Sequence, residues 1–191
     1  MVLQINKDFT IESCISSAYS NKGIMAIGYF LIQIKGVSYG VKEDDATALA
    51  NSYDAVIRRL EMKGKHIAPA DLIILPSLEL AQITNSSLYY RIDKQDSWDF
   101  SIPRDKLADI IYKNNLIWAP DGDEAFDDGS SVFQFDIDDE TVRLIGYKTS
   151  IDYNIHTLSD FKINSNEFYS TLKAWADGFY EEWQSFEKTI L

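Results

Sequence analysis

Polar and apolar residues alternate near the start of the chain with a period of two, which places one face of a strand on a core. Residues 9–16 show this pattern, with Phe, Ile, Ser and Ile on one side. The apolar run at 24–34 is nearly continuous, as expected for a strand covered on both faces. Lys35 and Gly36 can turn the chain back into residues 37–41. This part of the sequence therefore predicts an antiparallel meander.

A helical spacing follows the meander. Five apolar residues between Leu49 and Leu60 fall on one face of a helix. Asp44 or Asp45 is placed to cap this helix at its start, and Gly64 is placed to end it. The sequence predicts one amphipathic helix here.

The middle of the chain carries weaker signals. Pro69 and Pro76 interrupt residues 67–87, which we expect to be loop with one short helix at 78–83. The further elements expected are a hairpin of 88–92 and 98–102, a helix that begins at Pro103, strands at 132–137 and 141–147, and a strand at 158–163.

The clearest helical signal lies near the end of the sequence. Asn164 and Glu167 have the spacing of a capping box. Six apolar residues then share one stripe: Phe168, Leu172, Trp175, Phe179, Trp183 and Phe186. We predict a long helix with this stripe in the core.

Runs of strands with helices between them predict an α+β fold. We expect a largely antiparallel sheet with a long C-terminal helix and one or two further helices packed on it. The chain has 191 residues, of which 46% are hydrophobic and 25% are charged. These values are typical of a folded chain, and we expect a single domain over residues 1–191.

Sequence features also bear on location. Cys14 is the one cysteine, which excludes an internal disulfide and fits a reducing compartment. The polar start is unlike a signal peptide, and no apolar run is long enough for a membrane span. We therefore expect a cytoplasmic protein.

Negative charge is concentrated in one part of the sequence. The net charge is −12, and no Lys or Arg lies between Lys113 and Arg143. This window holds nine acids: Asp121, Asp123, Glu124, Asp127, Asp128, Asp136, Asp138, Asp139 and Glu140. Such charge repels nucleic acid and anionic lipid and favours a basic partner. A solvated surface without a partner is the other interpretation of such a cluster.

Candidate catalytic groups are few. We expect His66 and His156 to be solvated loop residues and Cys14 to be structural, because nothing pairs them as nucleophile and base. Asp136 and Asp138 could form a metal-binding pair, but Asp138 and Asp139 suit a hairpin turn. No cofactor or metal is expected. A carboxylate-based or metal-dependent hydrolase stays open as an alternative, as does an acidic adaptor for another basic protein.

Three motifs carry a resemblance to a known family: residues 128–136, residues 142–148, and 166–169 with Leu172 and Trp175. The chain resembles the immunity proteins numbered forty-two among the antidotes of polymorphic toxins, such as those of contact-dependent growth inhibition. The resemblance implies a protein that binds and neutralises the C-terminal domain of a cognate toxin, with no catalytic residues of its own.

The charge pattern and the resemblance point the same way. A nuclease toxin must bind a polyanion, so its cleft is basic, and an acidic inhibitor complements it. Tight binding also needs a buried anchor, for which Trp98, Trp118 and Phe126 are candidates. The predicted toxin-binding residues are Asp121, Asp123, Glu124, Phe126, Asp127, Asp128, Asp138, Asp139 and Glu140. We expect neither nucleic acid nor a membrane as a partner.

Overall fold

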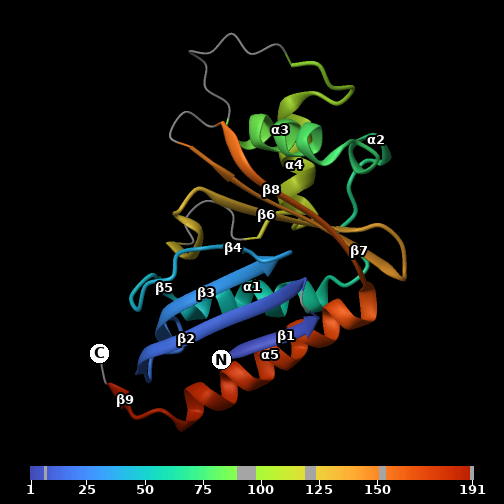
Figure 1. The fold of residues 1–191 in the computed structure, drawn as a ribbon. Helices are drawn as coiled ribbons and strands as arrows, with labels where there is room; N and C mark the ends of the chain where they lie inside the picture. Colours follow the sequence, from blue (N-terminus) through green and yellow to red (C-terminus); the bar gives the residue numbers. More distant parts are fainter. Residues whose placement is uncertain (7, 90–97, 119–123, 151–153, 190–191) are drawn as a thin grey trace.

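The computed structural model describes residues 1–6, 8–89, 98–118, 124–150 and 154–189, and its strands form two sheets (Figure 1). We call the six-stranded one sheet A and the three-stranded one sheet B. Sheet A has the order β1-β2-β3-β4, with β5 on β3 and β9 on β2. Its strands are β1 (Val2–Asn6), β2 (Phe9–Tyr19), β3 (Ala26–Ile34), β4 (Val37–Tyr39), β5 (Thr47–Ala48) and β9 (Lys188–Thr189). The predicted antiparallel meander is confirmed by β2, β3 and β4.

Helix α1 (Leu49–Glu61) packs beside this sheet, but its predicted cap is wrong. Its N-cap is Ala48, which forms no side-chain cap. Asp44 and Asp45 lie further back, because the chain first pairs as β5 with β3. The aspartates therefore belong to an exposed turn before β5.

Sheet B is an antiparallel meander of β6 (Ser130–Asp136), β7 (Thr141–Thr149) and β8 (Ile155–Asn164), as predicted. All residues of β6 are buried, although its sequence alternates. The reason is that sheet B is covered on both faces, so its polar positions are buried too.

Three helices cover one face of sheet B: α2 (Ala70–Ile73), α3 (Ser77–Leu88) and α4 (Arg104–Lys113). Helix α3 is much longer than the predicted short helix. Pro76 precedes it as the N-cap, where the missing N–H costs nothing, so this proline starts a helix instead of breaking one. The predicted helix after Pro103 is confirmed.

The predicted hairpin of 88–92 and 98–102 is wrong where the structure describes it. Leu88 is the last residue of α3, and residues 98–102 form no strand. Residues 90–97 lie outside the described chain. Among the described residues, the aromatic side chains that suggested strands lie instead at a helix end and in a loop, with Trp98 and Phe100 edge to face at 6.2 Å.

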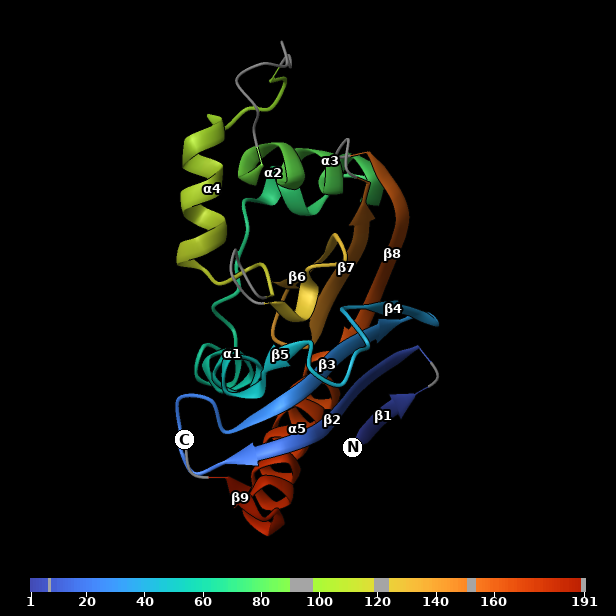
Figure 2. The same cartoon turned by 90° about the vertical axis from the view of Figure 1, so that its left-hand side faces the viewer.

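The final helix α5 (Ser165–Ser185) returns to sheet A and confirms the predicted long helix, except that Phe186, the last residue of the predicted stripe, lies after its end and is half-buried. The Asn164 side chain accepts hydrogen bonds from the backbone N–H groups of Asn166 and Glu167. The stripe from Phe168 to Trp183 is buried, and the indole of Trp175 donates to Ser13 Oγ on β2 at 3.0 Å. Figure 2 shows α1 and α5 beside sheet A, with α2, α3 and α4 at the other end of the molecule.

The core divides on the two faces of sheet B. One face, with Val132, Leu144 and Ile163, joins a cluster with sheet A, α1 and α5. The other, with Phe133, Phe135, Ile145 and Tyr147, joins α2, α3 and α4. The predicted α+β class with antiparallel strands and a long C-terminal helix is confirmed, with the strands divided between two sheets.

Candidate functional site

Strand β6 separates the acids of the base-free window into two groups. Residues 124–128 precede β6, and residues 138–140 follow it in the turn to β7. Seven strand residues span about 23 Å, so the two groups lie at opposite ends of sheet B. Asp121 and Asp123 lie outside the described residues.

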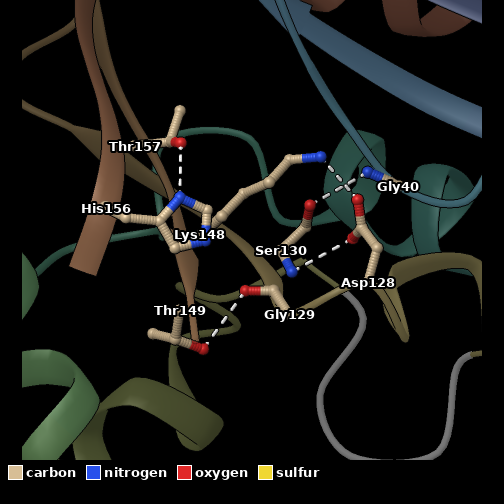
Figure 3. Close-up of polar contacts among 8 residues, drawn as sticks. All are labelled: Gly40, Asp128, Gly129, Ser130, Lys148, Thr149, His156 and Thr157. Carbon is tan, nitrogen blue, oxygen red and sulfur yellow. Dashed lines mark hydrogen bonds and ion pairs between the residues drawn. The ribbon is translucent and has the colours of Figure 1, made fainter. Parts of the chain in front are cut away.

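Asp128 is part of a polar turn that connects the two sheets (Figure 3). One carboxylate oxygen accepts from the backbone N–H of Ser130 at 3.1 Å, and the other pairs with Lys148 Nζ at 2.6 Å. The hydroxyl of Ser130 accepts from the N–H of Gly40, just beyond β4, at 3.1 Å. Lys148 thus brings a base beside Asp128, although none is close in sequence.

Gly129 makes this turn possible. Its φ of +79° favours glycine, and an added Cβ would lie 2.5 Å from the carbonyl oxygen of Thr149. The 128–130 segment of the family-like motif is therefore explained by backbone geometry and sheet connection.

The 3-10 helix η1 (Glu124–Phe126) is fixed against sheet A. The carbonyl of Ala125 accepts from the N–H of Val41 at 2.8 Å, and η1 also contacts β5. The loop between Val41 and β5 therefore begins and ends beside η1. This loop carries Glu43, Asp44 and Asp45, all exposed.

Two segments distant in sequence are thus anchored side by side, and both carry exposed acids. We call Glu43, Asp44, Asp45, Glu124 and Asp127 the η1 acidic surface, and all five are exposed. The nearby Lys42 pairs with Glu12 at 2.6 Å. The predicted toxin-binding residues did not include the three acids at 43–45, because Asp44 or Asp45 was expected to cap a helix and Glu43 was given no role. Three consecutive acids in the sequence were the signal that could have indicated a second cluster of negative charge.

The second group consists of Asp138, Asp139 and Glu140, which we call the turn acids; all are exposed. Asp138 Oδ1 accepts from the backbone N–H of Glu140 at 2.9 Å. This hydrogen bond, helped by the charge of Lys162, lowers the pKa of Asp138. Asp138 and Asp139 thus form the hairpin turn that the sequence predicts.

Asp136 is buried and does not belong to either surface. Its carboxylate accepts from the backbone N–H of Gly64 at 2.7 Å and from the hydroxyl of Tyr169 at 2.9 Å. The side-chain amide of Gln134 donates to it at 3.2 Å. These donors satisfy Asp136 as a structural acceptor that connects the end of α1, β6 and α5.

The prediction that His66 is a solvated loop residue is wrong. Its side chain is fully buried, and Nδ1 lies 3.0 Å from the carbonyl oxygen of Asn115. Burial and the nearby charge of Arg59 lower the pKa of His66. His156, by contrast, is exposed on β8, and its Nδ1 lies 2.9 Å from Thr157 Oγ1 (Figure 3).

Two of the three proposed anchors are core residues. Trp118 is 2% exposed and Phe126 is 7% exposed, and both rings pack near Phe30. Neither is available to a partner in this conformation, which removes Phe126 from the exposed candidates. Trp98 is half-buried, with its indole N–H donating to the carbonyl of Ile102 at 2.8 Å.

In the described part of the chain, no group of three His, Cys, Asp or Glu side chains is arranged to hold an ion. Cys14 is a free thiol, partly buried on β2. None of the helices described is both long and apolar enough to cross a membrane.

Comparison with known protein families gives a match over most of the chain. The family model for Immunity protein 42 matches residues 5–178, which cover sheet B, strands β2 to β5 of sheet A and most of α5. No curated protein and no solved structure matches the chain. The match spans far more than half of the sequence and agrees with the resemblance carried by residues 128–136 and 142–148. The chain belongs to the Immunity protein 42 family.

Proposed function

We propose that this protein binds the C-terminal domain of a cognate contact-dependent growth inhibition toxin, or of a related polymorphic toxin, and that this toxin is a nuclease. Membership of an immunity-protein family indicates toxin neutralisation. In this proposal the protein acts in the cytoplasm as a stoichiometric inhibitor, without catalysis of its own.

The observation that carries the nuclease assignment is the η1 acidic surface. Five exposed acids lie on two segments that the hydrogen bond from Val41 to Ala125 holds side by side. Clustered like charges repel one another, so such a surface favours a partner of opposite sign. A nuclease needs a basic cleft to hold its polyanionic substrate, and complementary potential speeds the encounter and disfavours wrong partners.

Co-expression and pull-down with the polypeptide encoded immediately upstream tests the binding. Charge reversal then tests the surface. Glu124→Lys with Asp127→Lys changes the η1 acidic surface and spares Asp128, which supports the turn. Association should slow about tenfold at low salt and lose much of its salt dependence.

Two matched variants locate the effect. Glu181→Lys with Glu187→Lys changes the same number of exposed acids, one in the last turns of α5 and one just beyond its end, and should leave association unchanged. Asp139→Lys with Glu140→Lys tests the turn acids separately. Equal association rates for the wild type and the η1 variant would show that this surface does not contact the toxin.

A further inference from the structure

The outer edge of β8 lacks the cover that the edge of β6 has. At β6, the N–H of Trp118 donates to Val132 O at 2.8 Å, the N–H of Gln134 donates to Leu116 O at 2.8 Å, and Asp136 donates to His66 O at 2.9 Å. These bonds give β6 a second neighbour beside β7.

Within the described part of the chain, β7 is the one strand that pairs with β8. Its ten residues pair with β7 from Asn164 to Ile155. Among the described residues, none gives β8 a backbone hydrogen bond beyond that ladder. Figure 2 shows β8 as the outer strand of sheet B on the side away from β6. Ten residues span about 33 Å, and β8 contains no proline or glycine to interrupt it.

A pocket lies on the helix-covered side of this edge. It has a volume of about 470 Å³ and is lined by Ile73, Ile74, Leu75, Ile137, Arg143, Asp160 and Lys162. Arg143 fixes it, because its guanidinium binds Asp160 at 2.7 Å and donates to the carbonyls of Ile73 and Leu75. The side chain of Ile74 at the rim is 79% exposed.

Asp160 and the three turn acids outnumber the two bases of this site, Arg143 and Lys162, so the charges beside the edge favour a cationic occupant. Asp160 is one-third exposed, although it pairs with Arg143. The turn acids follow Ile137 directly, and the carbonyl of Glu140 accepts from the N–H of Ser165 at 2.7 Å, beside the end of β8. A second copy of this chain is disfavoured, because each copy carries a net charge of −12.

We propose that an extended, cationic segment of the toxin domain adds to sheet B as a further strand along β8 and places an aliphatic side chain in the pocket beside Ile74. This proposal rests on the proposed function and adds the way in which the toxin domain binds. Backbone bonds along a free edge supply affinity, and the pocket beside it supplies specificity. The same strand would run from the end of sheet B near η1 toward the turn acids.

Hydrogen–deuterium exchange on the full chain tests this, with and without the toxin domain encoded upstream in a catalytically inactive form. Amides of β8 that point outward should exchange quickly in the free protein. In the complex they should slow at least tenfold at alternate positions within 157–162. Protection confined to other elements would overturn the proposal while leaving toxin binding intact, whereas no binding at all would refute the proposed function.

Two substitutions give a second readout. Ile74→Ser removes an exposed side chain, so the fold should persist while toxin affinity falls at least tenfold; Val2→Ser, at another exposed apolar position, is the matched control. The second substitution is proline at Thr157 or Leu158, whichever has the amide that exchanges quickly in the free protein. This proline should also weaken toxin binding, whereas alanine at the same position should not. Wild-type toxin affinity in both test variants would contradict the proposed strand addition. Protection of β8 that arises without toxin, from association of the protein with itself, would also contradict it.

Discussion

The ring of Tyr39 lies against Gly146, in the space that a Cβ atom at position 146 would occupy. Such an atom would lie 2.5 Å from two carbons of the ring. The Tyr39 hydroxyl lies 3.0 Å from the carbonyl oxygen of Gly146 and 2.8 Å from Ser159 Oγ. Because Tyr39 belongs to β4 and Gly146 to β7, this contact joins the two sheets.

Gly146→Ala should therefore destabilise the protein by about 1–3 kcal/mol, the usual cost of an overpacked core. Urea unfolding measures it. Tyr39→Leu with Gly146→Ala completes a double-mutant cycle, and the alanine should cost less on the leucine background. Gly23→Ala, at an exposed turn, is the matched control. Additive effects of the two core substitutions would contradict the contact.

Removal of the Arg59 side chain should lower the free energy of unfolding by more than Gly146→Ala does. Arg59 is 1% exposed, donates to the carbonyls of Asn115 and Ile117 at 2.9 and 2.6 Å, and stacks on Trp118 at 4.1 Å. Burial lowers its pKa to about 9, so it stays charged at neutral pH. Loss of a buried charged partner typically costs about 3–5 kcal/mol.

Chemical unfolding of Arg59→Ala measures this loss. Arg58→Ala, at the exposed neighbouring position of α1, is the matched control and should change the free energy of unfolding by less than about 0.5 kcal/mol. A similar, small effect at both positions would show that the carbonyls of Asn115 and Ile117 do not depend on Arg59.

His66 makes stability depend on pH. Its pKa in the folded state is lowered from the ordinary value of 6.5. Below that value the unfolded chain takes up a proton that the folded one resists, so stability should fall as pH decreases from about 6.5 toward the folded pKa. The slope from one proton is at most about 1.4 kcal/mol per pH unit.

Urea midpoints between pH 7.5 and 5 measure this slope. It should be reduced in His66→Gln and retained in His156→Gln, because His156 is exposed. An NMR titration of the His66 ring gives its pKa directly. A ring that titrates at 6.5 or above would contradict the prediction.

We propose that residues 1–191 unfold as one cooperative domain. The side chains of Val132, Val142, Leu144 and Ile163 from sheet B pack in the same cluster as sheet A, α1 and α5. Tryptophan fluorescence and far-UV circular dichroism should give coincident urea transitions. Two separated transitions would show that the sheets unfold independently.

Local pattern predicted the elements whose signals lie within one segment. The stripe from Phe168 to Trp183 predicted α5, and the alternation around Val132 predicted β6, because periodicity is a local property. Contacts between distant segments were not accessible. His66 is buried by carbonyls of Asn114 and Asn115, which no local pattern indicates.

The candidate site shows the same limit. The sequence indicated strong negative charge around Glu124 and Asp127, but grouped these acids with the turn acids on the far side of β6. The bond from Val41 to Ala125 brings Glu43, Asp44 and Asp45 to η1 instead. The sequence showed where the charged residues are concentrated. The pairing of strands in the fold determines which of them lie near one another.

The return of α5 to sheet A has a consequence for synthesis of the chain. Ser13 and Tyr19 of β2 receive hydrogen bonds from the indoles of Trp175 and Trp183, which the ribosome adds more than 150 positions later. The meander is thus translated early, yet the part of its apolar face that α5 covers stays open until this last helix emerges. Contacts between residues so far apart in sequence form slowly. The nascent chain therefore exposes apolar surface to chaperones during most of its translation.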